Sequence, residues 1–257
     1  MSQTAEKTFQ KEMEDEHSET WALDTAPQDL QWKWDFYFKE VPKEMRKNIQ
    51  MDEVGAYSVT EMKSAQEITN LIIEYLCVSP LTVKRKLKII DGCAGIGGNT
   101  LSFAKYFSKV TAVELSTSRC EMLKNNLQLL GFGDKVEVVN ADFCKMIKAL
   151  PWYDVVFLDP PWGGKDYKKE CLLDIFMGDM SIQDVCVKLE GKTGLVVLKL
   201  PKNFNIGPFR KAVESVCKIE LESVSRIPKI LLIILRYPTK KEETEVTNKL
   251  EQIRIHE

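Results

Sequence analysis

The spacing of hydrophobic and polar positions changes along this chain at about residue 62. From there to residue 237, short runs of β-branched and other apolar residues alternate with stretches in which apolar residues recur at helical spacing. Short apolar runs are typical of buried strands, and the stretches between them predict crossover helices. The pattern therefore predicts an α/β domain built on a mostly parallel sheet.

Seven runs have the length and composition of strands: 87–91, 109–113, 135–139, 154–158, 194–199, 219–225 and 230–235. Helices are expected between the first six of them, at 98–107, 118–130, 143–150, 182–189 and 208–217. Residues 226–229 alone separate the last two strands, which is too short for a parallel crossover. We therefore expect a seven-stranded sheet that closes with an antiparallel C-terminal hairpin.

The two ends of the chain differ from this central part. Residues 1–30 carry eight acidic side chains against two lysines, which predicts an acidic and flexible lead. Residues 31–61 begin with five aromatic side chains within seven positions and then regain basic residues, so we interpret them as a small helical extension that contacts substrate. The same aromatics would also suit a segment that packs on the core. Residues 238–257 form a charged tail.

Composition narrows the class of protein. With 44% hydrophobic and 29% charged residues among 257, the chain resembles ordinary globular proteins, and its net charge of −2 disfavours a long nucleic-acid footprint. Seven cysteines without a C-x-x-C pair, and two histidines near the termini, predict neither a metal site nor a disulfide framework. Without a membrane-length apolar run, we expect an intracellular protein.

A candidate ligand site lies at the first strand end. Asp91 begins a glycine-rich turn that runs to Asn99 and opens a helix, and such turns let a backbone approach a nucleotide-like ligand. Glu114 ends the second strand, where it can accept ribose hydroxyls, and Asp142 ends the third, where it can accept from an exocyclic amine. Phe143 stands beside it to cover a purine. Glycines that serve packing, and acids that cap helices, are the alternative interpretation.

The identity of the ligand follows from Asp91. A carboxylate at the mouth of this turn repels the pyrophosphate of a dinucleotide, but it suits the amino group of an amino acid. S-adenosylmethionine carries an amine, a ribose and an adenine, which match Asp91, Glu114 and Asp142 in order. A nicotinamide-dependent oxidoreductase is therefore the weaker hypothesis.

The second candidate site follows the fourth strand. The segment is Asp159-Pro160-Pro161-Trp162. Its two prolines restrict the backbone and lack amide hydrogens, so that the carbonyl groups are left to accept hydrogen bonds. Asp159 and the Pro160 carbonyl can hold the hydrogens of an NH2 group, and Trp162 offers a flat face to a planar ring. A proline-stiffened loop around a core tryptophan is the alternative.

These motifs together resemble the amino-methyltransferase group of class I S-adenosylmethionine enzymes, and more narrowly the trimethylguanosine synthases, which methylate N2 of the RNA cap guanine. The resemblance is carried by five stretches: Trp34-Asp35, the segment from Ile49 to Thr60 that ends in Ser58-Val59-Thr60, Cys93 to Thr100, Pro160 to Gly164 followed by Asp166-Tyr167, and Leu200-Pro201-Lys202-Asn203. Asp159 stands where many members have serine, and Lys202 where they have arginine.

The resemblance implies a Rossmann-like methyltransferase domain at 62–237 and a role for each motif residue. The implied catalytic residues are Asp159, Pro160 and Trp162. Those implied to bind the cofactor are Asp91, Cys93, Gly95, Gly97, Asn99, Thr100, Glu114, Asp142, Phe143 and Asp159. Those implied to bind substrate are Trp34, Tyr57, Ser58, Thr60, Trp162, Lys202 and Asn203.

The partner implied by the resemblance is a 7-methylguanosine-capped RNA, such as a small nuclear or small nucleolar RNA, and the products carry one or two methyl groups on guanine N2. We expect a monomer that acts in the nucleus. Two other functions fit part of the pattern: methylation of another nucleobase amine, such as adenine N6 or an internal guanine N2, and a catalytically inactive module that binds capped RNA. The acidic set formed by Asp91, Glu114 and Asp142 disfavours the inactive module.

Overall fold

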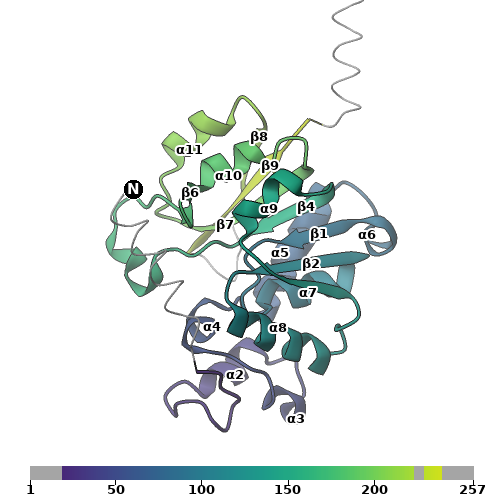
Figure 1. Ribbon diagram of the computed structural model, residues 1–257, viewed down its shortest axis with the longest axis vertical. Coiled ribbons are helices and arrows are strands. Elements are labelled where there is room, and N and C mark those ends of the chain that lie inside the picture. The colour runs from purple at the N-terminus through teal and green to yellow at the C-terminus, as the bar shows by residue number, and fades with distance from the viewer. Residues whose placement is uncertain (1–18, 223–228, 239–257) are drawn as a thin grey trace, which may run out of the picture.

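A seven-stranded sheet organises the chain, as shown by a computed structural model that describes residues 19–222 and 229–238 (Figure 1). The strand order is β3-β2-β1-β4-β7-β9-β8. The strands are β1 (Lys88–Asp91), β2 (Lys109–Glu114), β3 (Val136–Asn140), β4 (Tyr153–Leu158), β7 (Thr193–Pro201), β8 (Lys218–Glu222) and β9 (Ile230–Arg236). The predicted α/β fold and all seven predicted strands are confirmed.

Among the described residues, one strand of this sheet runs antiparallel to the others. β9 pairs antiparallel with both β7 and β8, whereas the other pairs are parallel. The predicted antiparallel hairpin is therefore confirmed, and its second strand, β9, lies between β7 and β8. The short connection fixes the pairing of the last two strands, and it carries no information about which of them adjoins β7. A small hairpin of β5 (Phe176–Met177) and β6 (Met180–Ser181) was not predicted.

Helices pack on both faces of the sheet. The longer ones lie near the positions that the sequence predicts, and α5 precedes the first strand. They are α5 (Met62–Tyr75), α6 (Pro80–Lys86), α7 (Gly98–Tyr106), α8 (Thr117–Leu129), α9 (Phe143–Met146), α10 (Ile182–Lys188) and α11 (Ile206–Val213), with the 3-10 turns η2 (Ile147–Ala149) and η3 (Gly164–Lys169).

Two hydrophobic cores form because successive side chains of a strand point to opposite faces. Ile89 packs in the core that contains α5, α7 and α8, whereas its neighbour Ile90 packs in the core that contains α9, α10 and α11. In β4, Phe157 and Leu158 divide between the two cores in the same way. The sheet is therefore buried on both faces, as is usual for parallel strands, and its strand ends are left to form the site.

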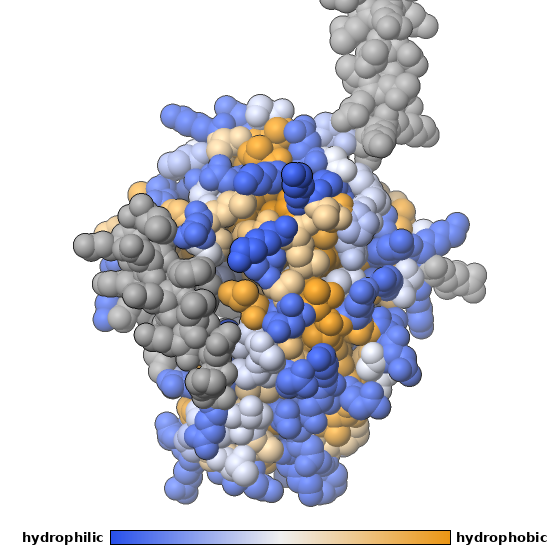
Figure 2. All heavy atoms as spheres, viewed as in Figure 1, coloured by the Kyte–Doolittle hydropathy of each residue, from blue (hydrophilic) through white to orange (hydrophobic). Residues whose placement is uncertain are grey.

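The N-terminal segment is part of the first core. The helices α2 (Trp32–Tyr37), α3 (Lys43–Arg46) and α4 (Glu53–Ser58) lie together at the lower end of Figure 1, near α8. Asn126 of α8 holds this segment, because its side chain accepts from the Gln50 amide at 2.8 Å and donates to the Gln50 carbonyl at 2.9 Å. Figure 2 shows hydrophilic residues over much of the visible face, with hydrophobic patches among them.

The flexible lead expected at 1–30 needs correction. Residues 1–18 lie outside the described residues, but Trp21, Ala26 and Leu30 are buried in the first core. Trp21 also forms an isolated antiparallel bridge with Met51. Three apolar side chains spaced four or five positions apart anchor this segment. The prediction of a flexible lead relied on its acidic composition and did not take these three positions into account. Residues 239–257 of the predicted tail lie outside the described residues.

Candidate functional site

Four strands bring the candidate residues to one edge of the sheet. Asp91 ends β1, Glu114 ends β2, Asp159 follows β4, and Lys199 lies near the end of β7. Because parallel strands end on the same side, these side chains converge where α/β sheets bind their ligands. Asp142 lies one strand further along, after β3.

The glycine-rich turn serves both packing and ligand approach. Gly97 has a φ of +104°, and a Cβ there would lie 2.7 Å from a side-chain atom of Leu123, so this glycine is required by packing. Gly95 has a φ of +54°, and no atom of the described structure lies within 4 Å of the position that its Cβ would take. The open side of the turn is therefore at Gly95, where a ligand can approach the backbone.

Asp91 is a buried carboxylate, and one of its two oxygens has no hydrogen-bond partner among the described residues. Its Oδ2 accepts from the Thr100 hydroxyl at 2.7 Å, whereas Oδ1 is buried and has no hydrogen-bond partner among the described residues. Burial raises the pKa of Asp91 to about 7, against the opposing effect of the Thr100 hydrogen bond, and the Asp159 and Glu114 carboxylates raise it further. An ammonium group placed at Oδ1 would supply the missing partner, which fits the amine of S-adenosylmethionine.

Glu114 holds the turn as well as facing it. Its Oε2 accepts from the Gly95 amide at 2.8 Å, and its Oε1 accepts from the Ser116 amide at 2.9 Å. Arg119 of α8 lies 3.3 Å from Glu114 and 3.3 Å from Asp52, the N-cap of α4, and all three side chains are buried. Glu114 does not cap α8, whose N-cap is Ser116, but it fixes the glycine-rich turn and the start of α8, and its proposed bonds to ribose would add to these contacts.

The adenine side of the site is only partly as expected. Asp142 caps α9 by accepting from the Cys144 amide at 2.9 Å, and its side chain remains partly exposed beside Lys145. Phe143 is buried in the second core, where it packs toward Gly92, so it does not present an open face to a purine. Cys93 is partly buried within the turn. The aromatic cover expected from Phe143 is therefore corrected to a wall residue of the core.

The acceptor motif contains a buried ion pair. Asp159 Oδ2 lies 2.5 Å from Lys199 Nζ and 3.4 Å from Asn99 Nδ2, and the Asp159 and Lys199 side chains are only 13% and 7% exposed. Burial raises the pKa of Asp159, although the Lys199 ammonium group and the hydrogen bonds from Asn99 and Thr60 oppose this rise. The carboxylate thus faces both the donor turn and the acceptor loop.

Trp162 lies between the two cores and beside this ion pair. Its ring centroid is 5.1 Å from that of Tyr167 in an edge-to-face arrangement, and Lys199 Nζ lies 5.3 Å from the ring. Its Nε1 is buried without a hydrogen-bond partner among the described residues. Gly163 and Gly164 follow with positive φ angles of 85° and 77°, which turn the chain away directly after the tryptophan.

Asn99 and Thr60 connect the donor turn to the N-terminal segment. Asn99 Nδ2 donates to Thr60 Oγ1 at 3.0 Å and reaches Asp159 Oδ2 at 3.4 Å, while Asn99 Oδ1 is buried without a partner among the described residues. Buried, unsatisfied acceptors are rare in native proteins and indicate a ligand or water position. The unsatisfied oxygens of Asp91 and Asn99 flank the open turn at Gly95, so the residues present fit S-adenosylmethionine.

Several substrate candidates have structural roles instead. Trp34 is fully buried and its Nε1 donates to the Ile49 carbonyl at 2.8 Å, so the expectation that it contacts substrate is corrected: it is a core residue. Asn203 donates to the Tyr167 and Glu170 carbonyls and thereby fixes the loop after Trp162.

The remaining substrate candidates are Ser58, Tyr57 and Lys202, and they differ in how much of the side chain is accessible. Ser58 donates to the Val54 carbonyl at 2.8 Å. Tyr57 is half exposed, with Lys33 Nζ 3.7 Å from its ring, and Lys202 is exposed. Tyr57 and Lys202 therefore keep side-chain surface that a substrate can reach.

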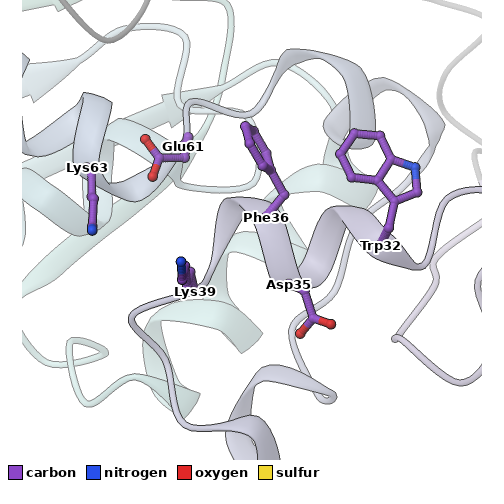
Figure 3. Close-up of a pocket in the computed structure, with 6 residues that line it drawn as sticks. All are labelled: Trp32, Asp35, Phe36, Lys39, Glu61 and Lys63. Carbon is purple, nitrogen blue, oxygen red and sulfur yellow. The ribbon is translucent and has the colours of Figure 1, made fainter.

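An exposed aromatic pair on α2 was missed by the sequence analysis. Trp32 and Phe36 are 57% and 54% exposed, and their ring centroids lie 5.8 Å apart. Together with Asp35, Lys39, Glu61 and Lys63 they line a pocket of about 410 Å³ (Figure 3). The helical spacing of the lead places Trp32 and Phe36 on one face and Trp34 on the opposite one, so a helical-wheel reading could have separated them.

Lys199 and Arg119 were also missed. Lys199 interrupts the apolar run of β7, and a lone charge inside a buried strand indicates a buried partner, which was the available signal. Arg119 gave no such signal, because an arginine in the first turn of a polar helix is ordinary. Within the described residues, no group of histidine, cysteine, aspartate and glutamate side chains could hold a metal ion, and no helix is long and apolar enough to cross a membrane.

Comparison with known proteins decides the family. The profile of the RNA cap guanine-N2 methyltransferases matches residues 86–229, which is more than half of the chain. The chain belongs to this family. It is therefore a methyltransferase, and the expected cofactor, S-adenosylmethionine, is confirmed.

Curated relatives include two named enzymes. An uncharacterised protein of Acanthamoeba polyphaga mimivirus is 33% identical over 74% of this chain and 82% of its own length. The trimethylguanosine synthases of Schizosaccharomyces pombe and Saccharomyces cerevisiae are 32% and 27% identical over 46% and 50% of this chain. These alignments span 48% and 43% of the two yeast proteins, which is about half of their lengths.

Solved structures confirm the Rossmann-like fold. The N-terminal domain of human METTL16 in complex with SAH superposes with a TM-score of 0.54 at 12% identity, over 70% of this chain and 73% of that one. The N2 G1207 methyltransferase RsmC of T. thermophilus gives a TM-score of 0.52 at 15% identity, over 67% of this chain and 43% of that one.

Proposed function

We propose that this protein transfers a methyl group from S-adenosylmethionine to the exocyclic N2 of a 7-methylguanosine RNA cap, giving 2,7-dimethylguanosine and, after a second transfer, 2,2,7-trimethylguanosine. The observation that carries the proposal is the junction at Asn99, which joins the donor turn to the acceptor carboxylate of Asp159 at 3.4 Å. Family membership and the two trimethylguanosine synthase relatives support the choice of guanine N2.

On the donor side, each acidic residue has a task. Asp91 would receive the amino group at its unsatisfied Oδ1, Glu114 the ribose hydroxyls, and Asp142 the adenine amine. The bound cofactor supplies an electrophilic methyl group on a sulfonium ion. Thr100 and the Gly95 amide keep Asp91 and Glu114 oriented, so that little reorganisation is needed when the cofactor binds.

On the acceptor side, positioning accounts for most of the expected acceleration. Asp159 and the Pro160 carbonyl would hold the amine hydrogens and direct the nitrogen lone pair toward the methyl carbon. The carbon–nitrogen bond would form as the carbon–sulfur bond breaks, and the extra proton on nitrogen would then pass to solvent water. A 7-methylguanine ring is cationic, so stacking on Trp162 gains roughly 1–2 kcal/mol that an unmethylated guanine lacks.

The first test is transfer of labelled methyl from S-adenosylmethionine to 7-methyl-GpppA, with GpppA as the paired substrate. Label on the 7-methylated dinucleotide alone, located at N2 by nucleoside mass spectrometry, is the expected result. Trp162→Ala should abolish this transfer while donor affinity changes little. Normal turnover by that variant would contradict the stacking role.

A different nucleobase amine is the second candidate function. Asp159 favours it, because aspartate before the two prolines is common in the wider amino-methyltransferase group, whereas many cap enzymes have serine there. Adenine N6 and internal guanine N2 in oligonucleotides are the substrates to compare with the cap dinucleotide. Label on an oligonucleotide but on neither dinucleotide would select this function.

The extension formed by residues 31–61 would contact the RNA that follows the cap. Glu61, which lines the pocket with Trp32 and Phe36, comes directly after Thr60, whose side chain accepts from Asn99 in the acceptor site (Figure 3). Stacking of one base on an aromatic residue contributes about 1–3 kcal/mol. Trp32→Ala should therefore raise KM about tenfold for a capped oligonucleotide and leave KM for 7-methyl-GpppA unchanged.

The remaining expectations stay predictions. A small nuclear or small nucleolar RNA as substrate, action in the nucleus and a monomeric state follow from the resemblance. Sedimentation of the full chain tests the monomer, and imaging of the tagged protein in its native cell tests the location.

A further inference from the structure

Beside the Asp159-Pro160-Pro161-Trp162 motif lies a second charged residue whose role the motif does not explain. Lys199 lies in β7, where it follows four consecutive apolar residues, and it is one of the few lysines that are buried among the described residues. Its Nζ lies 2.5 Å from Asp159 Oδ2 and 5.3 Å from the Trp162 ring. Burying an ammonium group costs several kcal/mol unless a partner compensates it, so this position requires the nearby carboxylate.

The carboxylate has the same requirement in return. Among the described residues, Lys199 is the one cation paired with Asp159, and the other neighbours of Asp159 are the side chains of Asn99, Thr60, Asp91 and Cys93. A buried charge at this position needs a countercharge, and Lys199 of β7 provides it.

We infer that Lys199 is a positioning residue of the acceptor site. It fixes the Asp159 carboxylate for the amine hydrogens, and the resulting ion pair keeps the surroundings of the Trp162 ring electrically neutral, so that a cationic base can stack there. The inference rests on the proposed function. It explains how a site can hold a lysine beside its stacking tryptophan and still accept 7-methylguanine. Without Asp159, the ammonium group would repel a cationic base and would leave a neutral one unaffected.

The size of this repulsion follows from the geometry. A base stacked on Trp162 would lie roughly 9 Å from Lys199 Nζ, because stacked atoms are separated by about 3.5 Å. At that distance two unit charges in a partly buried site interact strongly enough to change an equilibrium about tenfold. The preference for a 7-methylated over an unmethylated cap should therefore fall about tenfold when Lys199 stays and Asp159 is removed.

The test is a cycle of three variants, Asp159→Ser, Lys199→Met and the double variant, each assayed with 7-methyl-GpppA and GpppA. For Asp159→Ser we expect the ratio of kcat/KM values for the two caps to fall about tenfold, and for the double variant we expect it to return to within about threefold of the wild-type ratio. Lys188→Met, which removes an exposed lysine of α10, is the matched control. A wild-type ratio in Asp159→Ser would overturn the inference.

The pH profile separates positioning from a merely structural contribution. Lys199 lowers the pKa of Asp159 against the effect of burial. Its removal should therefore raise that pKa and shift the acidic limb of kcat/KM toward higher pH, so that Lys199→Met regains activity as the pH rises. The described groups that face Asp159 besides Lys199 are Asn99, Thr60, Asp91 and Cys93. An acidic limb that does not move would also overturn the inference.

Failure of the proposed function gives a different result. If the wild type labels neither dinucleotide although it binds S-adenosylmethionine, the cap substrate is wrong. The ion pair is then judged from urea unfolding of the same four proteins. If the two residues act as a pair, the double variant should lose less free energy of unfolding than the sum of the losses in Lys199→Met and Asp159→Ser. A loss in the double variant equal to that sum would show that they do not act as a pair.

Discussion

Removal of Arg119 should uncouple the donor site from the N-terminal segment. The guanidinium group lies 3.3 Å from both Glu114 and Asp52, and the three side chains are less than 10% exposed. Arg119→Met keeps most of the side-chain volume but leaves two buried carboxylates without their cation. Breaking a buried pair from one side costs about 3–5 kcal/mol, and we expect a loss of that size in the free energy of unfolding at pH 7.

The donor affinity should fall as well, because Glu114 would lose the group that orients it. One misplaced, charge-assisted hydrogen bond to the ribose corresponds to about 1.5–3 kcal/mol, or a tenfold to hundredfold weaker affinity. Urea unfolding monitored by circular dichroism gives the first quantity, and isothermal titration with S-adenosylmethionine gives the second. Adding Asp52→Asn to Arg119→Met should restore part of the stability, since only one buried carboxylate would remain uncompensated.

The control for this experiment is Lys124→Met on the same helix. Lys124 pairs with Glu121 at 2.8 Å, but both side chains are more than half exposed, and such pairs contribute little. This control should unfold at the same urea concentration as the wild type. If Arg119→Met behaved like Lys124→Met in both stability and donor affinity, the interpretation of the buried network would be refuted.

Three further predictions concern the turn and its neighbours. Since the pKa of Asp91 in the free protein is about 7, binding of the cationic donor should strengthen as the pH rises from 6 to 8, and Asp91→Asn should bind weakly with little pH dependence when titrated calorimetrically. Gly97→Ala should lower the free energy of unfolding by about 2 kcal/mol, because φ is +104° and Leu123 obstructs the new methyl group; a neutral effect in urea unfolding would contradict this. Thr60→Val should leave Asn99 with one partner fewer and reduce kcat for the cap dinucleotide about tenfold, with a smaller effect on donor affinity.

The architecture could be predicted because each strand carries its own signal. The runs at 87–91 and 154–158 are apolar and β-branched, and the helices between strands have recognisable spacing, so local pattern and fold agree. The position of β9 could not be predicted in this way. Its place between β7 and β8 depends on which of the two hairpin strands pairs with β7. That choice is a property of tertiary packing rather than of the strand's own sequence.

The candidate site shows the same division. Asp91, Glu114 and Asp159 were located because strand ends converge in a parallel sheet, which makes their proximity a consequence of topology. Trp34 was misjudged because residue type alone does not tell which face of a helix is buried, and its neighbour Trp32 is the exposed one. Lys199 was missed because its partner lies 40 positions away in sequence, and only the parallel pairing of β4 and β7 brings the two together.

Two polar bridges join the N-terminal segment to the candidate site. Asp52 reaches the donor side through Arg119 and Glu114, and Thr60 reaches the acceptor side through Asn99. Both bridges are buried, where hydrogen bonds between charged or polar groups are costly to break. A substrate that contacts the exposed surface of this segment would therefore contact a part of the chain that is bonded to Glu114, through Arg119, and to Asn99. The aromatic pocket, whose lining includes Glu61 next to Thr60, is therefore connected to the candidate site through the Thr60–Asn99 hydrogen bond.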